Sequence, residues 1–240
     1  MSGTGNNGAA PWLTYHGVNI YRVPNSTAYF YVTSNIAIDA DGAPNAYNPQ
    51  NTGLDALGNA GYPHGQWQSV LVPDPLNPTS AYVQKAGDPF PGYFVAMTSL
   101  LDKTQPITDT HRYLDARSVP YLVFPGAFYE TQGTGALGDL AMVRDLTNGR
   151  TSCAIVGDIG PHDAPLGEMA IGLAVNLGGT NPNPRNGDGA PPGPFQYVVF
   201  PGSRSDPAWP LAPAQMLALA NARLAQMGGW PVVNAGSGEV

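Results

Sequence analysis

The sequence predicts a mainly β fold with a few helices (α+β), organised as a single β-barrel-like domain. The chain has 30 glycines and 25 prolines among 240 residues and is only 11% charged, which favours a loop-rich β domain over a helical one. Its apolar runs are short, aromatic and β-branched, as in strands. Their spacing is typical of hairpins, which favours a barrel over alternating βαβ units.

The expected strands follow these apolar runs in order. Tyr29–Thr33 combines aromatic and β-branched side chains, and the alternating run after Asn35 ends at Gly42 in a turn. The dipeptide Asn148-Gly149 between two later runs indicates a hairpin. The expected strands cover residues 29–33, 36–41, 67–72, 92–98, 121–124, 139–144, 152–157 and 195–200.

Two helices are expected, at residues 169–177 and 213–227. The first ends at Gly178-Gly179, and the second has Pro213 in its first turn and Gly228-Gly229 at its end. Its apolar face is expected to carry Leu217, Ala220, Leu224 and Met227. Residues 1–10 are expected to form a flexible tail, residues 11–240 one domain, and residues 43–66 and 180–194 long loops, the first with one helical turn near residues 54–58.

Composition excludes several classes of function. The formal net charge is −7, and no basic patch is present for a nucleic acid. No segment is apolar enough to span a membrane, and no signal peptide is visible. We therefore expect a cytoplasmic chain, one secreted or exported by another route, or one whose leader was removed. Cys153 lies in an apolar run and is expected to be a buried, inert thiol. We expect no cofactor, no metal and a monomer, and an acidic surface that attracts a cationic polymer.

Two acids stand out. Asp158 ends an apolar run, a Gly/Pro-rich loop follows, and Glu168 stands where a helix is expected to begin. Cleavage of a glycosidic bond needs two carboxylates that face each other across a groove. A turn at a strand end is the structural alternative for Asp158, and a helix-start acid is the alternative for Glu168.

A second acidic pair precedes Gly42. Asp39 and Asp41 alternate along a strand and are expected on one face. They could bind a substrate amine or add a third carboxylate to a groove, or they could close an Asx turn. His162 and Asp163, in the loop between the two main acids, could touch substrate or be solvated.

Six short motifs occur in one order along the chain. They are Asn35-Ile-Ala-Ile-Asp39-Ala-Asp41-Gly42, Val119-Pro-Tyr-Leu-Val-Phe-Pro-Gly126, Gly138-Asp139-Leu-Ala-Met-Val, Ile155-Val-Gly-Asp158-Ile-Gly-Pro, Gly167-Glu168 and Tyr197-Val-Val-Phe-Pro-Gly-Ser203. Together they resemble the fungal-type chitosanases, glycoside hydrolase family 75, and most of all their bacterial relatives, over roughly residues 28 to 204. Fungal members typically carry Cys where this chain has Ala40, which removes a disulfide partner and no catalytic group.

The resemblance implies an endo-acting, inverting hydrolase of chitosan with Asp158 and Glu168 as its essential pair, and a six-stranded double-psi barrel. A helix start would lower the pKa of Glu168 and favour it as the base, whereas burial would raise it. We expect Glu168 as the acid and Asp158 as the base. Two other functions stay open: an exported bacterial hydrolase of peptidoglycan glycan strands, and a non-catalytic carbohydrate-binding module.

Overall fold

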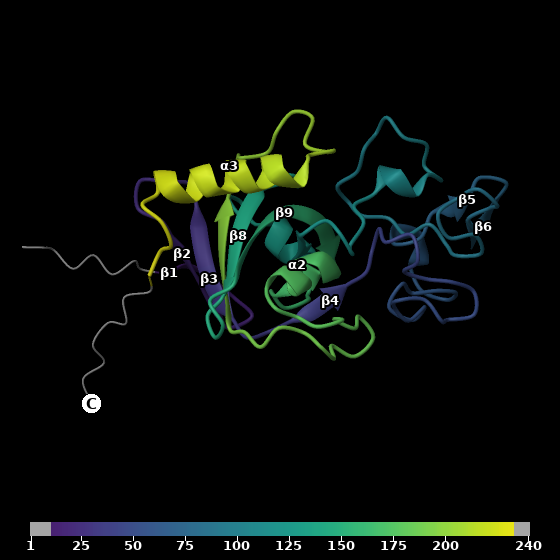
Figure 1. The fold of residues 1–240 in the computed structure, drawn as a ribbon, viewed down its shortest axis with the longest axis horizontal. Coiled ribbons are helices and arrows are strands. Elements are labelled where there is room, and N and C mark those ends of the chain that lie inside the picture. Colours follow the sequence, from purple (N-terminus) through teal and green to yellow (C-terminus); the bar gives the residue numbers. More distant parts are fainter. Residues whose placement is uncertain (1–10, 233–240) are drawn as a thin grey trace, which may run out of the picture.

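A nine-stranded mixed sheet forms the centre of the protein (Figure 1). The computed structural model describes residues 11–232, so the expected tail at residues 1–10 lies outside the described residues. The strand order is β1-β2-β3-β11-β8-β9-β7-β10-β4. The strands are β1 Pro11–Tyr15, β2 Val18–Arg22, β3 Tyr29–Thr33, β4 Ala37–Asp39, β7 Tyr121–Pro125, β8 Leu140–Asp145, β9 Thr151–Gly160, β10 Glu168–Ala170 and β11 Phe195–Phe200.

The expected mainly β architecture with a few helices is therefore confirmed, whereas a closed barrel is not found in the described residues. The end strands β1 and β4 do not pair with each other. Most pairs are antiparallel, and β7 pairs in parallel with β9, as β10 does with β4. The Asn148-Gly149 hairpin forms as predicted and joins β8 to β9.

Both faces of the central strands are buried, which explains their near-continuous apolar sequences. Phe30 and Val198 pack on one face, and their neighbours Tyr31 and Tyr197 pack on the other. The first face is covered by α3 (Pro213–Gln226), which packs on β8 and β9. The second face is covered by α1 (Gly126–Glu130) and α2 (Ile171–Asn176).

The helices differ from the prediction in detail. Residues 168–170 form strand β10, and α2 begins only at Ile171. The helix expected at 169–177 is therefore shorter than predicted. The core face of α3 carries Met216, Ala220 and Leu224, whereas Leu217 is 45% exposed. With 14 residues, α3 is the longest helix of the described chain, and none of these helices is long and apolar enough to cross a bilayer.

Residues 42–113, here called the loop lobe, project beside the sheet on the right of Figure 1. The strands expected at 67–72 and 92–98 are wrong: their apolar residues make only isolated bridges, among them Leu71 with Ala96. The helical turn expected near residues 54–58 is also absent. The lobe's short elements are η1 (Trp67–Ser69), β5 (Pro73–Asp74), β6 (Asn77–Ala81) and η2 (Thr110–Arg112).

Apolar packing on the sheet and hydrogen bonds from a neighbouring loop both hold the loop lobe in place. Trp67 and Leu71 belong to the same apolar core as the α3 face of the sheet. The Arg185 guanidinium, from the predicted loop at 180–194, donates to the carbonyl oxygens of Asn51, Gly53 and Asp55 at 2.8 to 3.3 Å. The lobe therefore sits against the sheet at a defined place, next to the ends of β4 and β9.

Candidate active site

Asp158 lies on the long strand β9, just after a bulge. Strand pairing with β7 joins Tyr121 to Ile155 and Val123 to Asp158, with a register shift between the two pairs. Side chains that pair across a ladder lie on the same face, so the bulge places Asp158 on the face that also carries Tyr121 and Val123. That face is the one covered by α3 and the loop lobe.

Glu168 is the first residue of β10 and does not start a helix. The prediction of a helix start is wrong because β10 pairs with β4 and β7 before α2 begins at Ile171. Glu168 pairs with Ala37, while Met169 pairs with Leu122 of β7. Glu168 therefore projects on the same face as Tyr121 and Asp158, and a helix dipole has no part in setting its pKa.

Asp39 completes this face from β4. It pairs with Ala170, two residues after Glu168, so both acids project on the same face. The buried phenol of Tyr121 donates to Asp39 Oδ2 and to the carbonyl oxygen of Asp41, both at 2.9 Å. The Asp41 backbone N–H donates to Asp39 Oδ1 at 2.8 Å. Asp39 thus makes the predicted Asx turn and still faces the other acids.

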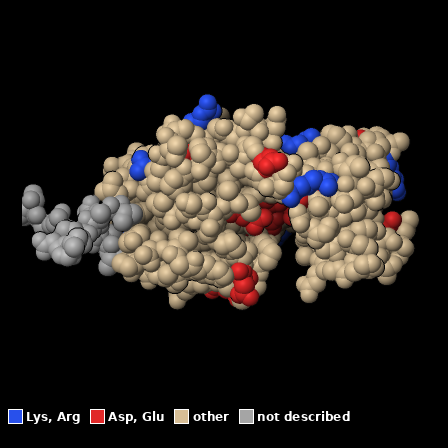
Figure 2. Space-filling model, turned by 90° about the horizontal axis from the view of Figure 1, so that it is seen from below, with Lys and Arg blue, Asp and Glu red and all other residues tan. Residues whose placement is uncertain are grey.

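The strands place Asp158 and Glu168 on opposite sides of one strand. The order β9-β7-β10 puts a single strand between them. Neighbouring strands lie about 4.8 Å apart, so the two backbones are roughly 10 Å apart with both side chains on one face. Asp and Glu side chains gather in a hollow between the larger part of the protein and the loop lobe (Figure 2).

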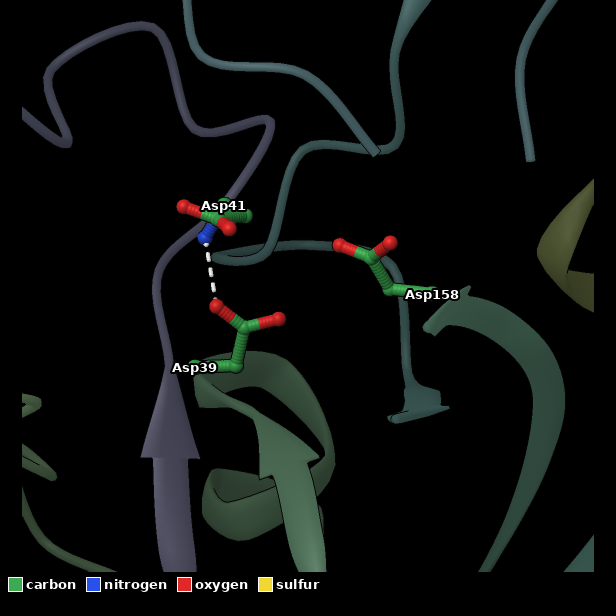
Figure 3. Close-up of side chains that lie close together, drawn as sticks. All are labelled: Asp39, Asp41 and Asp158. Atoms are coloured by element: carbon green, nitrogen blue, oxygen red, sulfur yellow. Dashed lines mark hydrogen bonds between the residues drawn. The ribbon is translucent and has the colours of Figure 1, made fainter. Parts of the chain in front are cut away.

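Three hydrogen bonds converge on one oxygen of Asp158. The Ser99 hydroxyl, the Ser99 N–H and the Ile159 N–H donate to Asp158 Oδ1 at 2.5, 2.9 and 2.7 Å. Asp158 is 7% exposed. Figure 3 shows its carboxylate directed toward Asp39 and Asp41. The arrangement stabilises an ionised Asp158 in a buried setting, because carboxylates with several N–H and O–H donors hold their charge.

The acids perturb one another. Burial raises the pKa of Asp158 to about 6, against the opposing effect of its Ser99 and Ile159 donors. Burial, followed by the nearby charges of Asp158 and Asp55, raises the pKa of Glu168 to about 7. Burial and the neighbouring carboxylates also raise the pKa values of Asp39 and Asp41 well above the ordinary range. Not all of these groups are ionised together at neutral pH.

Asp41 extends the cluster into the loop lobe. Its Oδ1 accepts a hydrogen bond from the Tyr47 hydroxyl at 2.8 Å, and the same hydroxyl contacts Asp55 Oδ2 at 3.2 Å. Each of Asp39, Asp41 and Asp158 offers one oxygen within 4.8 Å of the others (Figure 3). Such spacing would suit a small cationic group, an ammonium among them, and the expectation that no metal binds stays a prediction.

His162 and Asp163 form a separate group. His162 Nδ1 lies 2.8 Å from Asp163 Oδ1, and its Nε2 lies 3.8 Å from Glu130 Oε2. Both side chains are well exposed, and among residues 11–232 no hydrogen bond or ion pair joins either to Asp158 or Glu168. The neighbouring carboxylate of Asp163 raises the pKa of His162. Their contact with substrate stays a prediction.

Four residues that organise the acids are not evident from the sequence: Ser99, Tyr121, Tyr47 and Asp55. Tyr121 lies within one of the six motifs, where an aromatic residue in an apolar strand indicates core packing. Ser99 contacts Asp158 across 59 residues of chain, and Tyr121 contacts Asp39 across 82. No local pattern marks such partners, although a buried acid does require donors somewhere in the fold.

Two other hollows lie in the described structure, with volumes of about 380 and 430 Å³. Arg223 is the charged residue lining the first, and the second is lined by residues of 16–21 and 32–35, with His16 among its titratable side chains. Neither is lined by a carboxylate, so neither offers the acid–base groups that the acidic hollow provides.

No protein-family model matches this chain, and no curated protein is significantly similar to it.

Proposed function

We propose that this protein is an endo-acting, inverting glycoside hydrolase that cleaves β-1,4 bonds of chitosan, a polymer of glucosamine. The observation that carries the proposal is the placement of Asp158 and Glu168 on one sheet face, across β7, with pKa values near 6 and 7. Inverting glycosidases hold two carboxyl groups about 6.5–9.5 Å apart, with a water between one of them and the sugar. The resemblance to the fungal-type chitosanases independently selects the same two residues.

Asp158 is the proposed base. Its Oδ1 accepts three hydrogen bonds, which favour the ionised carboxylate, and its other oxygen is left to accept a proton. A base of this kind draws a proton from a water as the water attacks the anomeric carbon. Of the pair, Asp158 also has the lower pKa.

Glu168 is the proposed acid. Within the described residues, no hydrogen bond to its carboxyl group opposes the effect of burial. A carboxyl group with a pKa near 7 carries its proton at mildly acidic pH and can deliver it to the leaving oxygen. The structure thus supplies a physical reason for the expected order of roles, with the proton on Glu168 and the charge on Asp158.

The charge of the hollow supports an amino-sugar substrate. Asp39, Asp41 and Asp55 lie beside the pair, and among the described residues no Lys or Arg forms an ion pair with any of these acids. Such a surface attracts protonated amines and repels anionic sugars. We assign Asp39 and Asp41 to the binding of glucosamine ammonium groups, with Asp41 as the more accessible of the two.

The finer fold and the location of the protein belong to the same proposal. The six-stranded double-psi barrel expected from the family resemblance stays part of this proposal. The mixed parallel and antiparallel pairing of β7, β9, β10 and β4 fits such a barrel, whereas the nine-stranded sheet of the described residues does not close. A polymer substrate outside the cell would require export of the protein.

The release of reducing ends from chitosan and from purified peptidoglycan tests the proposal. Wild-type protein is expected to act on chitosan, and Asp158→Asn and Glu168→Gln to lose at least about 10²-fold of that activity. Glu130→Gln, a surface carboxylate variant, is the matched control and should keep it. Activity on peptidoglycan alone would favour a hydrolase of bacterial wall glycans. Binding of chitosan without release of ends would favour a carbohydrate-binding module.

A further inference from the structure

Ser99 lies where the loop lobe meets β9. The N–H of Leu100 donates to the Gly157 carbonyl oxygen at 2.9 Å. The buried hydroxyl of Thr98 donates to the Leu100 carbonyl oxygen at 2.7 Å and accepts from the Leu114 N–H at 3.0 Å. Residues on both sides of Ser99 are therefore anchored, and its side chain is held over the start of the Asp158–Gly160 segment.

The hydrogen bonds of Ser99 fix the direction of its hydroxyl proton. Its Oγ lies 3.3 Å from the Ile159 N–H, which can only donate, so the Ser99 oxygen accepts there. The single hydroxyl proton is then free to point to Asp158 Oδ1, 2.5 Å away. Because Oδ1 also accepts from the N–H groups of Ser99 and Ile159, a proton on Oδ1 would face three donors.

We propose that Ser99 is a positioning residue of this hydrolase, which keeps Asp158 Oδ1 a permanent acceptor and leaves Oδ2 as the atom that takes the proton of the attacking water. The inference rests on the proposed function. In that step the water oxygen bonds to the anomeric carbon as its proton passes to Asp158 Oδ2. The glycosidic C–O bond breaks as the Glu168 proton passes to the leaving oxygen. Proton exchange with solvent then removes the proton from Asp158 and returns one to Glu168.

The surroundings of Asp158 make this support necessary. The titratable groups that face it are Asp39 from β4, Asp41 after β4, Glu168 from β10 and the phenol of Tyr121 from β7. None of them is a cation that would favour its ionisation, and the burial of Asp158 opposes it. In the described structure the Ser99 hydroxyl and the two backbone N–H groups are the contacts that favour it.

Ser99 is itself exposed, so contact with the sugar is the competing role. The two roles differ in what they change. A positioning role predicts that Ser99→Ala raises the pH at which Asp158 ionises and lowers kcat at acidic pH, with little change in KM. A sugar contact predicts a raised KM with the titration of Asp158 unchanged.

A carbon NMR titration of the aspartate carboxyl groups tests the inference without relying on activity. Asp158→Asn assigns the Asp158 signal. In Ser99→Ala its midpoint should rise by about one pH unit, the size expected when one hydrogen bond to a carboxylate is lost. Ser99→Thr retains the hydroxyl and should restore the midpoint. Ser69→Ala is the matched control, because Ser69 is an exposed lobe serine whose hydroxyl donates to a backbone carbonyl.

An unshifted midpoint in Ser99→Ala, or a Ser99→Thr variant that behaves like Ser99→Ala, overturns the Ser99 proposal whatever the activity. If KM rises while the midpoint is unshifted, the Ser99 proposal is also overturned, and Ser99 instead contacts the sugar. A shifted midpoint in a protein that never cleaves chitosan overturns the proposed function but supports the positioning of Asp158. If Ser99→Ala unfolds, Ser99→Cys replaces it, because a thiol keeps the shape and donates more weakly.

Discussion

Glu168 Oε2 lies 3.2 Å from the point where a Cβ atom on Gly160 would stand. Gly160 comes two residues after Asp158, on the same strand and the same face. The carboxylate of Glu168 therefore reaches across β7 toward β9 and fills space that any other residue at 160 would occupy. Because Gly160 has no side chain, the proposed acid Glu168 can lie closer to the proposed base Asp158.

Gly160→Ala is expected to lower kcat on chitosan by roughly 10-fold, because small displacements of a catalytic group cost that much or more. The new methyl group would lie 3.1 Å from Val123 Cγ1 on one side and 3.2 Å from Glu168 Oε2 on the other. Because it is crowded on both sides, the Glu168 carboxylate has to shift. KM should change little, and the melting temperature should fall only slightly. Steady-state kinetics and a thermal melt check both.

The control for this variant is Gly58→Ala, at an exposed lobe position where a Cβ would meet no atom within 4 Å. It should leave kcat unchanged. A Gly160→Ala protein with wild-type kcat would show that the space beside Glu168 has no part in its placement.

The pH dependence of kcat/KM, which reports groups of the enzyme without substrate, should be bell-shaped. It rises as Asp158 loses its proton near pH 6 and falls as Glu168 loses its proton near pH 7. Because the acids interact, the two limbs belong to the pair. Initial rates at oligosaccharide concentrations well below KM give kcat/KM directly. A maximum near pH 4, where carboxyl groups of ordinary pKa would be half ionised, contradicts this assignment of roles.

Stability should depend on pH in the opposite sense to that of a salt-bridged acid. The pKa of Glu168 is raised from 4.5 to about 7 in the folded state, so the folded state binds the proton more tightly than the unfolded state does. Its contribution is fully present below pH 4.5 and is lost as the pH rises through about 7. The melting temperature of the wild type should therefore fall over this interval.

Glu168→Gln removes that loss. At pH 8 the variant should melt several degrees above the wild type, since about 1 kcal/mol shifts the melting temperature of a protein of this size by roughly 2–4 °C. At pH 4 the two should melt together, and Glu130→Gln on the surface should show neither effect. Equal melting temperatures at pH 8 would mean that Glu168 ionises at its ordinary pKa.

Salt should weaken the binding of chitosan, because screening shortens the reach of the carboxylates to about 8 Å at physiological ionic strength. Asp41→Asn should raise KM a few-fold, the range of partly exposed charge contacts, with a smaller effect on kcat. Asp39→Asn should also raise KM. It should lower the melting temperature, because an amide nitrogen at the place of Oδ2 cannot accept the hydrogen bond from the buried Tyr121 hydroxyl.

Asp206→Asn makes the same change of net charge at an exposed site and should leave KM unchanged. If Asp41→Asn lowers thermal stability but binds chitosan like the wild type, Asp39 and Asp41 only close their turn.

The sequence predicted the strands whose two faces are both buried. Tyr29–Thr33 and Phe195–Phe200 appear as continuous aromatic and β-branched runs because helices, strands and the loop lobe cover both sides of the sheet. In the loop lobe the same composition gave a wrong prediction of strands. Leu71 and Phe94 are buried there by irregular segments and make only isolated bridges. Strands β1 and β2 were missed, although His16 and Gly17 form a tight turn with positive φ between them.

The candidate site could be predicted only in part. The motifs select Asp158, Glu168, Asp39 and Asp41, and strand pairing brings these four acids to one face. Their convergence depends on the bulge before Asp158 and on β10, a strand of three residues that looks helical in the sequence. The donors Ser99 and Tyr121 come from distant segments, so their roles become visible only in the folded chain.

Proton NMR of the first product released from chitosan is the most direct test of inversion by Asp158 and Glu168. If Asp158 activates a water on the face of the sugar opposite Glu168, cleavage of a β-linkage must give a new reducing end in the α configuration before mutarotation. We expect α-anomer signals to grow first with the wild-type protein and to be absent with Asp158→Asn or Glu168→Gln. A β-anomer as the initial product, or an α-anomer released by either variant at the wild-type rate, would contradict it.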